Sequence, residues 1–299
     1  MRPQRARGLV ALAALVALAV LPALMRDIQR WVVAPAPSED ARWGIIDSSG
    51  EYVRPVYFSG ANGDGFAPNG LAAAKDAKTH LWGYVRKDGT WAIEPRFSQA
   101  RAFSVVGLAA AQGRRGEAQW GKWGYIDESG AWAIEPQYDV PGVFYGDGMA
   151  SVRVGDDRLW IDEGGNVVDG PSDEDEKPRA EWDEATGLDG IRSPDGTWLV
   201  EPSFSQLRSR GYSDLLVAYP AEEPKSCGIV NRSGEWLLPP IYEDIVIPAD
   251  GDEAVAVRDA DSGLCGYVRW DGAWAIEPRF ADATRMGPDG YALAEAVLR

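Results

Sequence analysis

Histidine and cysteine, the residues most often found in catalytic and metal centres, are scarce in this chain. Its 299 residues include one histidine, His80, and two cysteines, Cys227 and Cys265. One histidine excludes a histidine-rich metal site and disfavours a histidine-based catalytic triad. Two cysteines can build neither a disulfide scaffold nor a four-thiolate zinc site. The sequence also has no phosphate-binding glycine loop and no nucleophile elbow, so we expect no metal, no cofactor and no catalytic residue.

Positive charge is in short supply as well. Lysine and arginine number 30 against 46 aspartates and glutamates, a net charge of −16. Residues 1–40 carry five basic and three acidic side chains, a net charge of +2, which leaves −18 for the remainder. Such a field repels phosphate backbones and disfavours anionic ligands in general. Nucleic acid is therefore excluded as an expected partner.

Long hydrophobic runs are absent except for one, at residues 8–24. It follows Arg2, Arg5 and Arg7, and its 17 residues lie at the short limit for crossing a bilayer. We expect an apolar helix within residues 1–33 that anchors the protein in the inner membrane, with residues 34–42 as a linker. The protein would then be held at the cell envelope with residues 43–299 in the periplasm, or secreted if the segment is cleaved as a signal peptide.

Glycine and tryptophan are abundant, with 34 and 13 copies, because one unit is repeated seven times. Residues 82–97, 123–138 and 265–280 are the clearest copies. Each predicts a strand one containing an aromatic residue or cysteine followed by glycine, a tight glycine turn, and a strand two that ends at proline. An apolar strand three follows. The residues that define the repeat are Gly44, Gly50, Gly83, Gly89, Gly124, Gly130, Gly196, Gly228, Gly234, Gly266, Gly272, Pro95, Pro136, Pro202 and Pro278.

The repeats predict an all-β fold of seven three-stranded units. A short loop joins each strand three to the next strand one, so these two strands should pair. The strand at Trp43 and the strand within residues 291–297 would then complete one sheet, which favours a propeller-like ring over an open β-solenoid. Two features argue against closure: units of about 38 residues are short for four-stranded blades, and the fourth copy, at Leu159, has no clear third strand.

The units resemble the WG repeat, also called the KWG repeat, of bacterial proteins. Residues 123–138 and 148–152 match its pattern of aromatic–glycine strand, glycine turn, strand with Ile-x-Pro, and Gly-Leu-Ala strand. The resemblance extends over residues 43–299. It implies a β-repeat domain at the cell envelope that serves in interactions, and it implies no common reaction and no catalytic residues.

The strand-two tryptophans are the candidate binding residues. Their recurrence is what packing between units requires, but an exposed row of indoles could bind glycan or peptide. Repeated glutamates before the prolines favour a solvent-facing position over a paired acid site. The tryptophans are Trp91, Trp132, Trp198, Trp236 and Trp274, and the glutamates are Glu94, Glu135, Glu201 and Glu277.

Cys227 and Cys265 fill the same slot in adjacent copies. They are either two buried small residues that replace tryptophan or, in an oxidising compartment, a disulfide.

These features predict a non-catalytic, envelope-associated scaffold that binds a protein partner. The alternative is a carbohydrate- or peptidoglycan-binding module that uses the repeated tryptophans on cell-wall glycan. A hydrolase with carboxylates at the mouth of the ring is less well supported.

Overall fold

The computed structural model describes residues 42–116, 120–170, 178–209, 213–222, 225–249 and 251–297. Strands joined by turns and loops make up this part of the chain, and it contains no helix. Residues Glu39–Arg299 form one compact unit, whereas the unit Met1–Ser38 lies outside the described residues. The predicted anchor in residues 1–33 therefore lies outside them too. No helix in the described part of the chain is long and apolar enough to cross a membrane.

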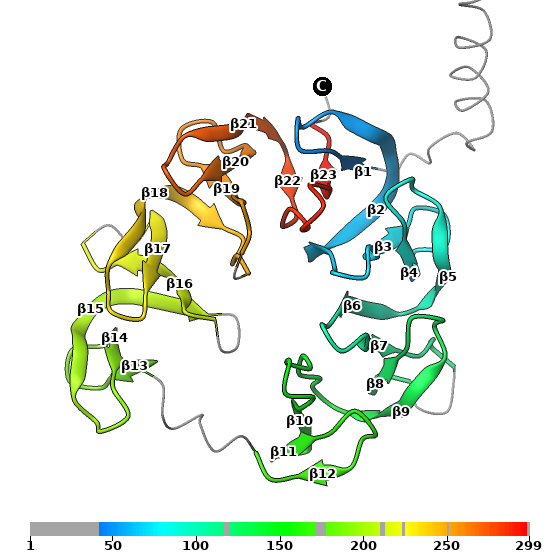
Figure 1. Ribbon diagram of the computed structural model, residues 1–299, viewed down its shortest axis with the longest axis horizontal. Helices are drawn as coiled ribbons and strands as arrows, with labels where there is room; N and C mark the ends of the chain where they lie inside the picture. Colours follow the sequence, from blue (N-terminus) through cyan, green and yellow to red (C-terminus); the bar gives the residue numbers. More distant parts are fainter. Residues whose placement is uncertain are drawn as a thin grey trace, which may run out of the picture. The chain divides into compact units, whose positions relative to one another are not determined.

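The described strands of unit Glu39–Arg299 form four hydrogen-bonded sheets, of seven, three, nine and four strands. We divide them into seven modules, each numbered by the strand one that it contains (Figure 1). Module 1 contains β22 (Asp282–Ala283), β23 (Ala292–Glu295), β1 (Trp43–Ile46) and the first half of β2 (Tyr52–Phe66). Module 2 contains the second half of β2, then β3 (Ala72–Asp76), β4 (Trp82–Val85) and β5 (Trp91–Phe97). Module 3 contains β6 (Gln99–Phe103), β7 (Ala109–Gln112), β8 (Trp123–Ile126) and β9 (Trp132–Tyr138).

The other modules repeat this order. Module 4 contains β10 (Ala150–Val154), β11 (Asp157–Ile161) and β12 (Val167–Val168). Module 5 contains β13 (Arg179–Asp183), β14 (Leu188–Arg192) and the first half of β15 (Trp198–Ser209). Module 6 contains the rest of β15, β16 (Leu215–Pro220), β17 (Cys227–Asn231) and the first half of β18 (Trp236–Ile245). Module 7 contains the rest of β18, β19 (Ala254–Asp259), β20 (Cys265–Arg269) and β21 (Trp274–Phe280).

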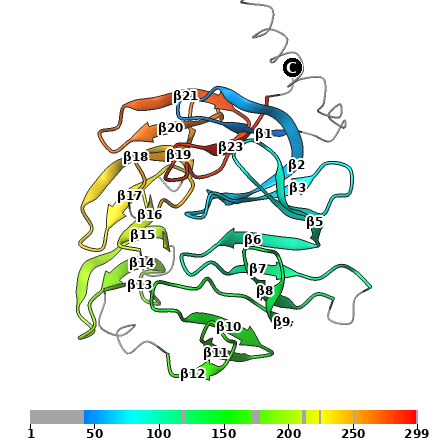
Figure 2. The ribbon, with the colours of Figure 1, turned by 45° about the vertical axis from the view of Figure 1, so that its right-hand side comes forward.

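Strand two is longer than predicted and serves two modules. The first part of β2 pairs with β1, and its last part pairs with β3, so β2 passes from one module to the next (Figure 2). β15 and β18 do the same. The expectation that proline ends strand two is therefore wrong, and a 38-residue unit is long enough for four-stranded modules because one strand is shared.

Proline is tolerated inside strand two because it lies in a bulge. Trp82 faces Phe97 and Tyr84 faces Ile93, so two extra residues of β5 lie between these pairs. Pro95 is within that segment, where a missing N–H costs no ladder hydrogen bond. The same offset recurs in the five other modules with a strand-one glycine.

The strand-one glycine makes room for this bulge. A Cβ on Gly124 would lie 2.4 Å from the backbone oxygen of Ile134, and the equivalent distance is 2.4 to 2.7 Å in all six copies. The turn glycines have a different role, because their φ angles of 78° to 87° are strained for other residues. The turn glycines among the repeat-defining residues are Gly50, Gly89, Gly130, Gly196, Gly234 and Gly272.

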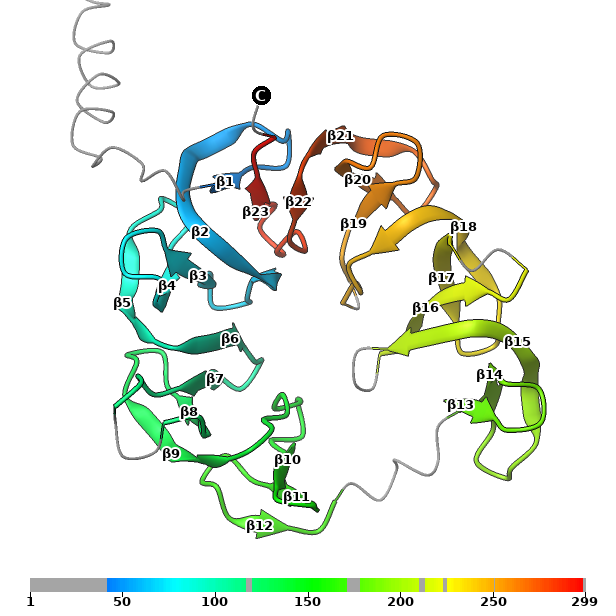
Figure 3. The ribbon, with the colours of Figure 1, turned by 180° about the vertical axis from the view of Figure 1, so that it is seen from behind.

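The first and last repeats complete one module, as predicted for a ring. β1 pairs with β23 over four residues, from Trp43–Glu295 to Ile46–Ala292. Figures 1 and 3 show β23 between β22 and β1 from opposite sides. The fourth copy also has its third strand, because β13 pairs with β14 along five residues. The sequence of β13, Arg-Ala-Glu-Trp-Asp, lacks the small apolar residues of the other third strands, so the sequence pattern does not predict it.

We expect Gly124→Ala to destabilise the protein by about 3 kcal/mol, since the new methyl group would have to displace the strand-two backbone. Gly146→Ala is the matched control, because a Cβ there meets no atom within 4 Å and its φ is not positive. Urea unfolding would measure both. Equal stability of the two variants would contradict the close approach.

Candidate functional site

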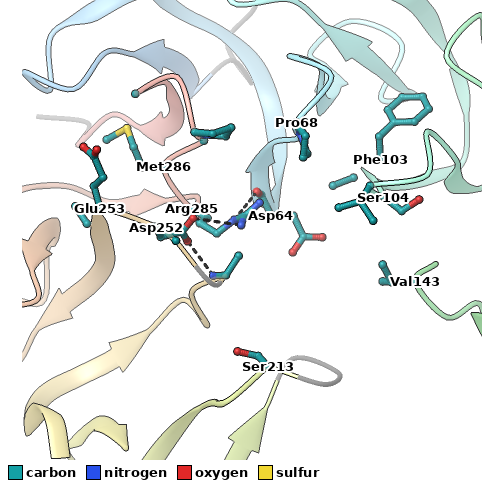
Figure 4. Close-up of a pocket in the computed structure, with 18 of the residues that line it drawn as sticks. Asp64, Pro68, Phe103, Ser104, Val143, Ser213, Asp252, Glu253, Arg285 and Met286 are labelled. Carbon is teal, nitrogen blue, oxygen red and sulfur yellow. Dashed lines mark hydrogen bonds and ion pairs between the residues drawn. The ribbon is translucent and has the colours of Figure 1, made fainter. Parts of the chain in front are cut away.

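A cavity of about 900 Å³ lies where the turns between strand two and strand three converge (Figure 4). Six modules contribute such a turn, and residues 171–177, within that of module 5, are not among the described residues. Because the turns belong to repeated units, they bring residues far apart in the sequence to one place. One lining residue from each contributing turn, in chain order, is Pro68, Val105, Asp147, Ser213, Asp252 and Arg285.

The cavity wall combines apolar and acidic side chains. Phe103 and Met286 contribute apolar surface, and Asp64, Asp147 and Glu253 contribute carboxylates. A concave surface of this mixed kind is typical of a binding site. No group of three or more histidine, cysteine, aspartate or glutamate side chains that could hold a metal ion occurs in the described part of the chain.

A buried ion pair joins three consecutive turns at the cavity. The Arg285 guanidinium lies 3.4 Å from the Asp252 carboxylate, and the two side chains are only 11% and 8% exposed. Arg285 Nε also donates to the backbone oxygen of Asp64 at 3.2 Å, and its backbone N–H donates to Gly63. Asp252 accepts a hydrogen bond from the backbone N–H of Ala249 at 2.9 Å. These bonds connect modules 7, 1 and 2, so the pair supports the junction at which the two ends of the domain meet.

Breaking this pair should be costly, because an unpaired buried charge remains. We expect Arg285→Met to lower the free energy of unfolding by about 3–5 kcal/mol, and the double variant Arg285→Met with Asp252→Leu to recover most of that loss. The exposed pair Lys122–Asp139 provides the control, and Lys122→Met should cost under about 1 kcal/mol. Urea unfolding of all three variants measures these losses. If Arg285→Met lowers the free energy of unfolding no more than Lys122→Met does, the Arg285–Asp252 pair does not support the junction.

Four of the five strand-two tryptophans lie between modules rather than at the cavity. Their rings meet, edge to face, the aromatic residue that follows the bulge of the preceding module, with centroids 5.5 to 6.3 Å apart. No strand-two tryptophan is among the residues that line the cavity. The pairs are Trp91–Phe58, Trp132–Phe97, Trp236–Phe204 and Trp274–Tyr242.

The junction of the last module with the first uses the same contact. Tyr52 fills the tryptophan slot and meets Phe280 edge to face at 6.0 Å. Arg279 of module 7 also donates to the backbone oxygen of Gly50 in module 1. In the same way, Arg96 of module 2 donates to the backbone oxygen of Gly130 in module 3. The aromatic row therefore has a packing role at each of these junctions, while Trp198 lies under the Arg192 guanidinium at 4.0 Å.

Three of the repeated segments match a known family of repeats. The family model described as "WG containing repeat" matches residues 82–112, 123–156 and 228–251. The chain is a WG-repeat-containing protein. A search of curated proteins found no match to it.

Solved structures similar to this WG-repeat protein have low identity. A streptogramin B lyase is 13% identical over 86% of this chain and 99% of its own, with a TM-score of 0.45. The β-propeller domain of Cps50 (Swd1) from Myceliophteria thermophila is 9% identical over 89% and 99%, with a TM-score of 0.38. Hsv2 of Kluyveromyces lactis is 13% identical over 77% and 68%, with a TM-score of 0.32. Values this low carry no information about activity.

The two cysteines of the WG-repeat protein are free and buried. Cys227 packs with residues of modules 6 and 7, whereas Cys265 packs with residues of modules 7 and 1. The disulfide considered from the sequence is therefore not present in the structure, because the equivalent slots lie in separate clusters at successive junctions. Burial raises the pKa of each thiol to about 11.

A raised thiol pKa means that the folded protein holds these protons more tightly than the unfolded chain. We therefore expect stability to be unaffected below about pH 9 and to fall as the pH rises from about 9 to 11. The double variant Cys227→Val with Cys265→Val should lose less stability over that interval. Urea unfolding between pH 7 and 11 measures the effect, and identical pH profiles for the two proteins would refute it.

The remaining candidates have structural positions. The four repeated glutamates are exposed and lie in the strand-two bulge, beside inward-facing residues such as Ile93. His80 lies in the turn between β3 and β4 with a φ of 56°.

None of the residues that line the cavity is among the candidate site residues predicted from the sequence. A second set of turn glycines, which precedes strand three, could have located them: Gly70, Gly107, Gly148 and Gly290 all have positive φ.

Proposed function

We propose that residues 43–299 form a seven-module, propeller-like ring that acts as a non-catalytic scaffold and binds a protein partner at the central cavity. The observation that carries the proposal is the convergence of six turns on one cavity of about 900 Å³. Loops held by a repeated framework are the usual carriers of binding residues, because they can vary without disturbing the framework.

The contacts at the two ends of the repeat domain support the ring. β1 and β23 share a sheet, and Tyr52 and Phe280 form the aromatic contact that internal junctions also use. In a ring, the inner turns face a common axis, which is the geometry that places a partner segment against several modules at once.

The lining of the cavity supports binding rather than catalysis. Arg285 and Asp252 bond to each other and to neighbouring backbone groups, so their side chains support the wall. The acids that remain, with the net charge of −16, favour a neutral or cationic partner. Cell-wall glycan bound by the tryptophans is the weaker alternative, since their rings pack against aromatic neighbours.

Location at the cell envelope is part of the proposal and rests on the sequence of residues 1–33. With that segment in the inner membrane, the ring would act as an anchored periplasmic platform.

Photo-crosslinking in native membranes tests the cavity as the docking site. Val105 lines the cavity and is 66% exposed, whereas Val53 is 48% exposed and does not line it. We expect a photoreactive residue at position 105 to form an adduct with one protein, and the same residue at position 53 to form none. The partner, once identified and purified, should bind Val105→Asp at least about tenfold more weakly than wild type, a loss of about 1.4 kcal/mol.

Equal crosslinking at the two positions, or adducts only at position 53, would refute the cavity as the docking site. A shift in tryptophan fluorescence on adding cell-wall fragments, without any protein adduct, would favour the glycan alternative.

A further inference from the structure

Six of the seven junctions between modules contain a hydrophobic cluster. The clusters lie between modules 1 and 2, 2 and 3, 3 and 4, 5 and 6, 6 and 7, and 7 and 1. None of the six joins module 4 to module 5 in the part of the chain that the structure describes. This junction, which we call the seam, lies between β12 and β13 (Figures 1 and 3).

The aromatic contact between modules has no counterpart at the seam among the described residues. Elsewhere the strand-two ring meets an aromatic residue of the preceding module, as Trp132 meets Phe97. On module 5, Trp198 is covered by Arg192 of its own module.

One edge of β13 has no strand partner among the described residues. Strand three of modules 1, 2, 3, 6 and 7 pairs with a strand on each side. In module 4 it has β11 on one side and the single bridge Val140–Arg153 on the other. β13 pairs only with β14. A strand edge of this kind presents N–H and C=O groups that can pair with another chain.

The surroundings of this edge are acidic and carry an exposed indole. Trp182 of β13 is 57% exposed. The nearby arginines, Arg179 and Arg192, both lie within 3.3 Å of Glu181. Within residues 179–189, the acids Glu181, Asp183, Glu184 and Asp189 outnumber the one arginine, Arg179, which leaves a net charge of −3.

Charge decides which occupant fits. A second copy of this chain would bring another edge with the same net charge of −3, and this excess of like charge disfavours the pair. A lysine- or arginine-rich strand would instead find carboxylates and an indole face that can bind a cation.

We propose that the edge of β13 that no described strand covers binds an extended, lysine- or arginine-rich segment of a partner protein, which adds to the sheet as a strand. Backbone hydrogen bonds would supply the affinity, and the acids with Trp182 would select the charge. This site is separate from the central cavity and does not depend on the proposal made for it.

A synthetic peptide of alternating lysine and valine is the probe, with the whole chain as receptor. We expect calorimetry to show binding that weakens as salt is added. Trp182→Lys should bind at least about tenfold more weakly, a loss of about 1.4 kcal/mol. Trp120→Lys is the matched control at 55% exposure, and it should bind as tightly as wild type. Hydrogen exchange of the amides in residues 179–183 should slow when the peptide binds.

Several results would overturn the proposal. These are no binding of the peptide, equal loss in the two tryptophan variants, or unchanged exchange in residues 179–183. Equally tight binding of the same peptide with alternate backbone amides methylated would rule out strand addition. Self-association of the chain that Trp182→Lys abolishes would identify a second copy as the occupant. Hydrogen exchange is measured on the unmodified protein, so its result does not depend on whether a variant folds. Crosslinking at position 105 tests the cavity separately, so the two proposals can fail independently.

Discussion

The close approach of strand two to the strand-one glycine is the constraint on which the rest of this structure depends. Two extra residues of strand two pass over the glycine, and the carbonyl beyond it lies where any Cβ would stand. A bulge bends the strand that carries it. The bent strand leaves its own module and pairs in the next. The bulge that requires glycine in strand one therefore also connects consecutive modules.

This connection explains the aromatic pattern. The residue just past the bulge, such as Phe97, ends the pairing in one module and meets the strand-two ring of the following module. Because the ends of the domain make the same contact through Tyr52 and Phe280, the first and last copies are joined as the internal copies are. The fourth copy has Leu159 in place of the strand-one glycine, and the seam lies directly after it.

Much of this architecture was predictable because the same residue types recur at the same positions in several copies of the repeat. The turn glycines and the pairing of β1 with β23 followed from the spacing and order of the repeated segments, and the WG repeat followed from resemblance to a known family. The continuation of strand two past Pro95 did not, because a proline in a bulge and a proline that ends a strand look alike in sequence. The third strand of the fourth copy was missed because Arg179–Asp183 is largely polar, and its strand character comes from pairing with β14.

The sequence by itself determined the class of fold, the number of modules and the acidity of the domain, since these depend on local pattern and composition. Only the tertiary structure decided that the tryptophans pack between modules, that the cysteines stay apart, and that six turns share a cavity. Those outcomes depend on which surfaces meet after the strands curve, and residues such as Asp64 and Arg285, at opposite ends of the domain, become neighbours only then.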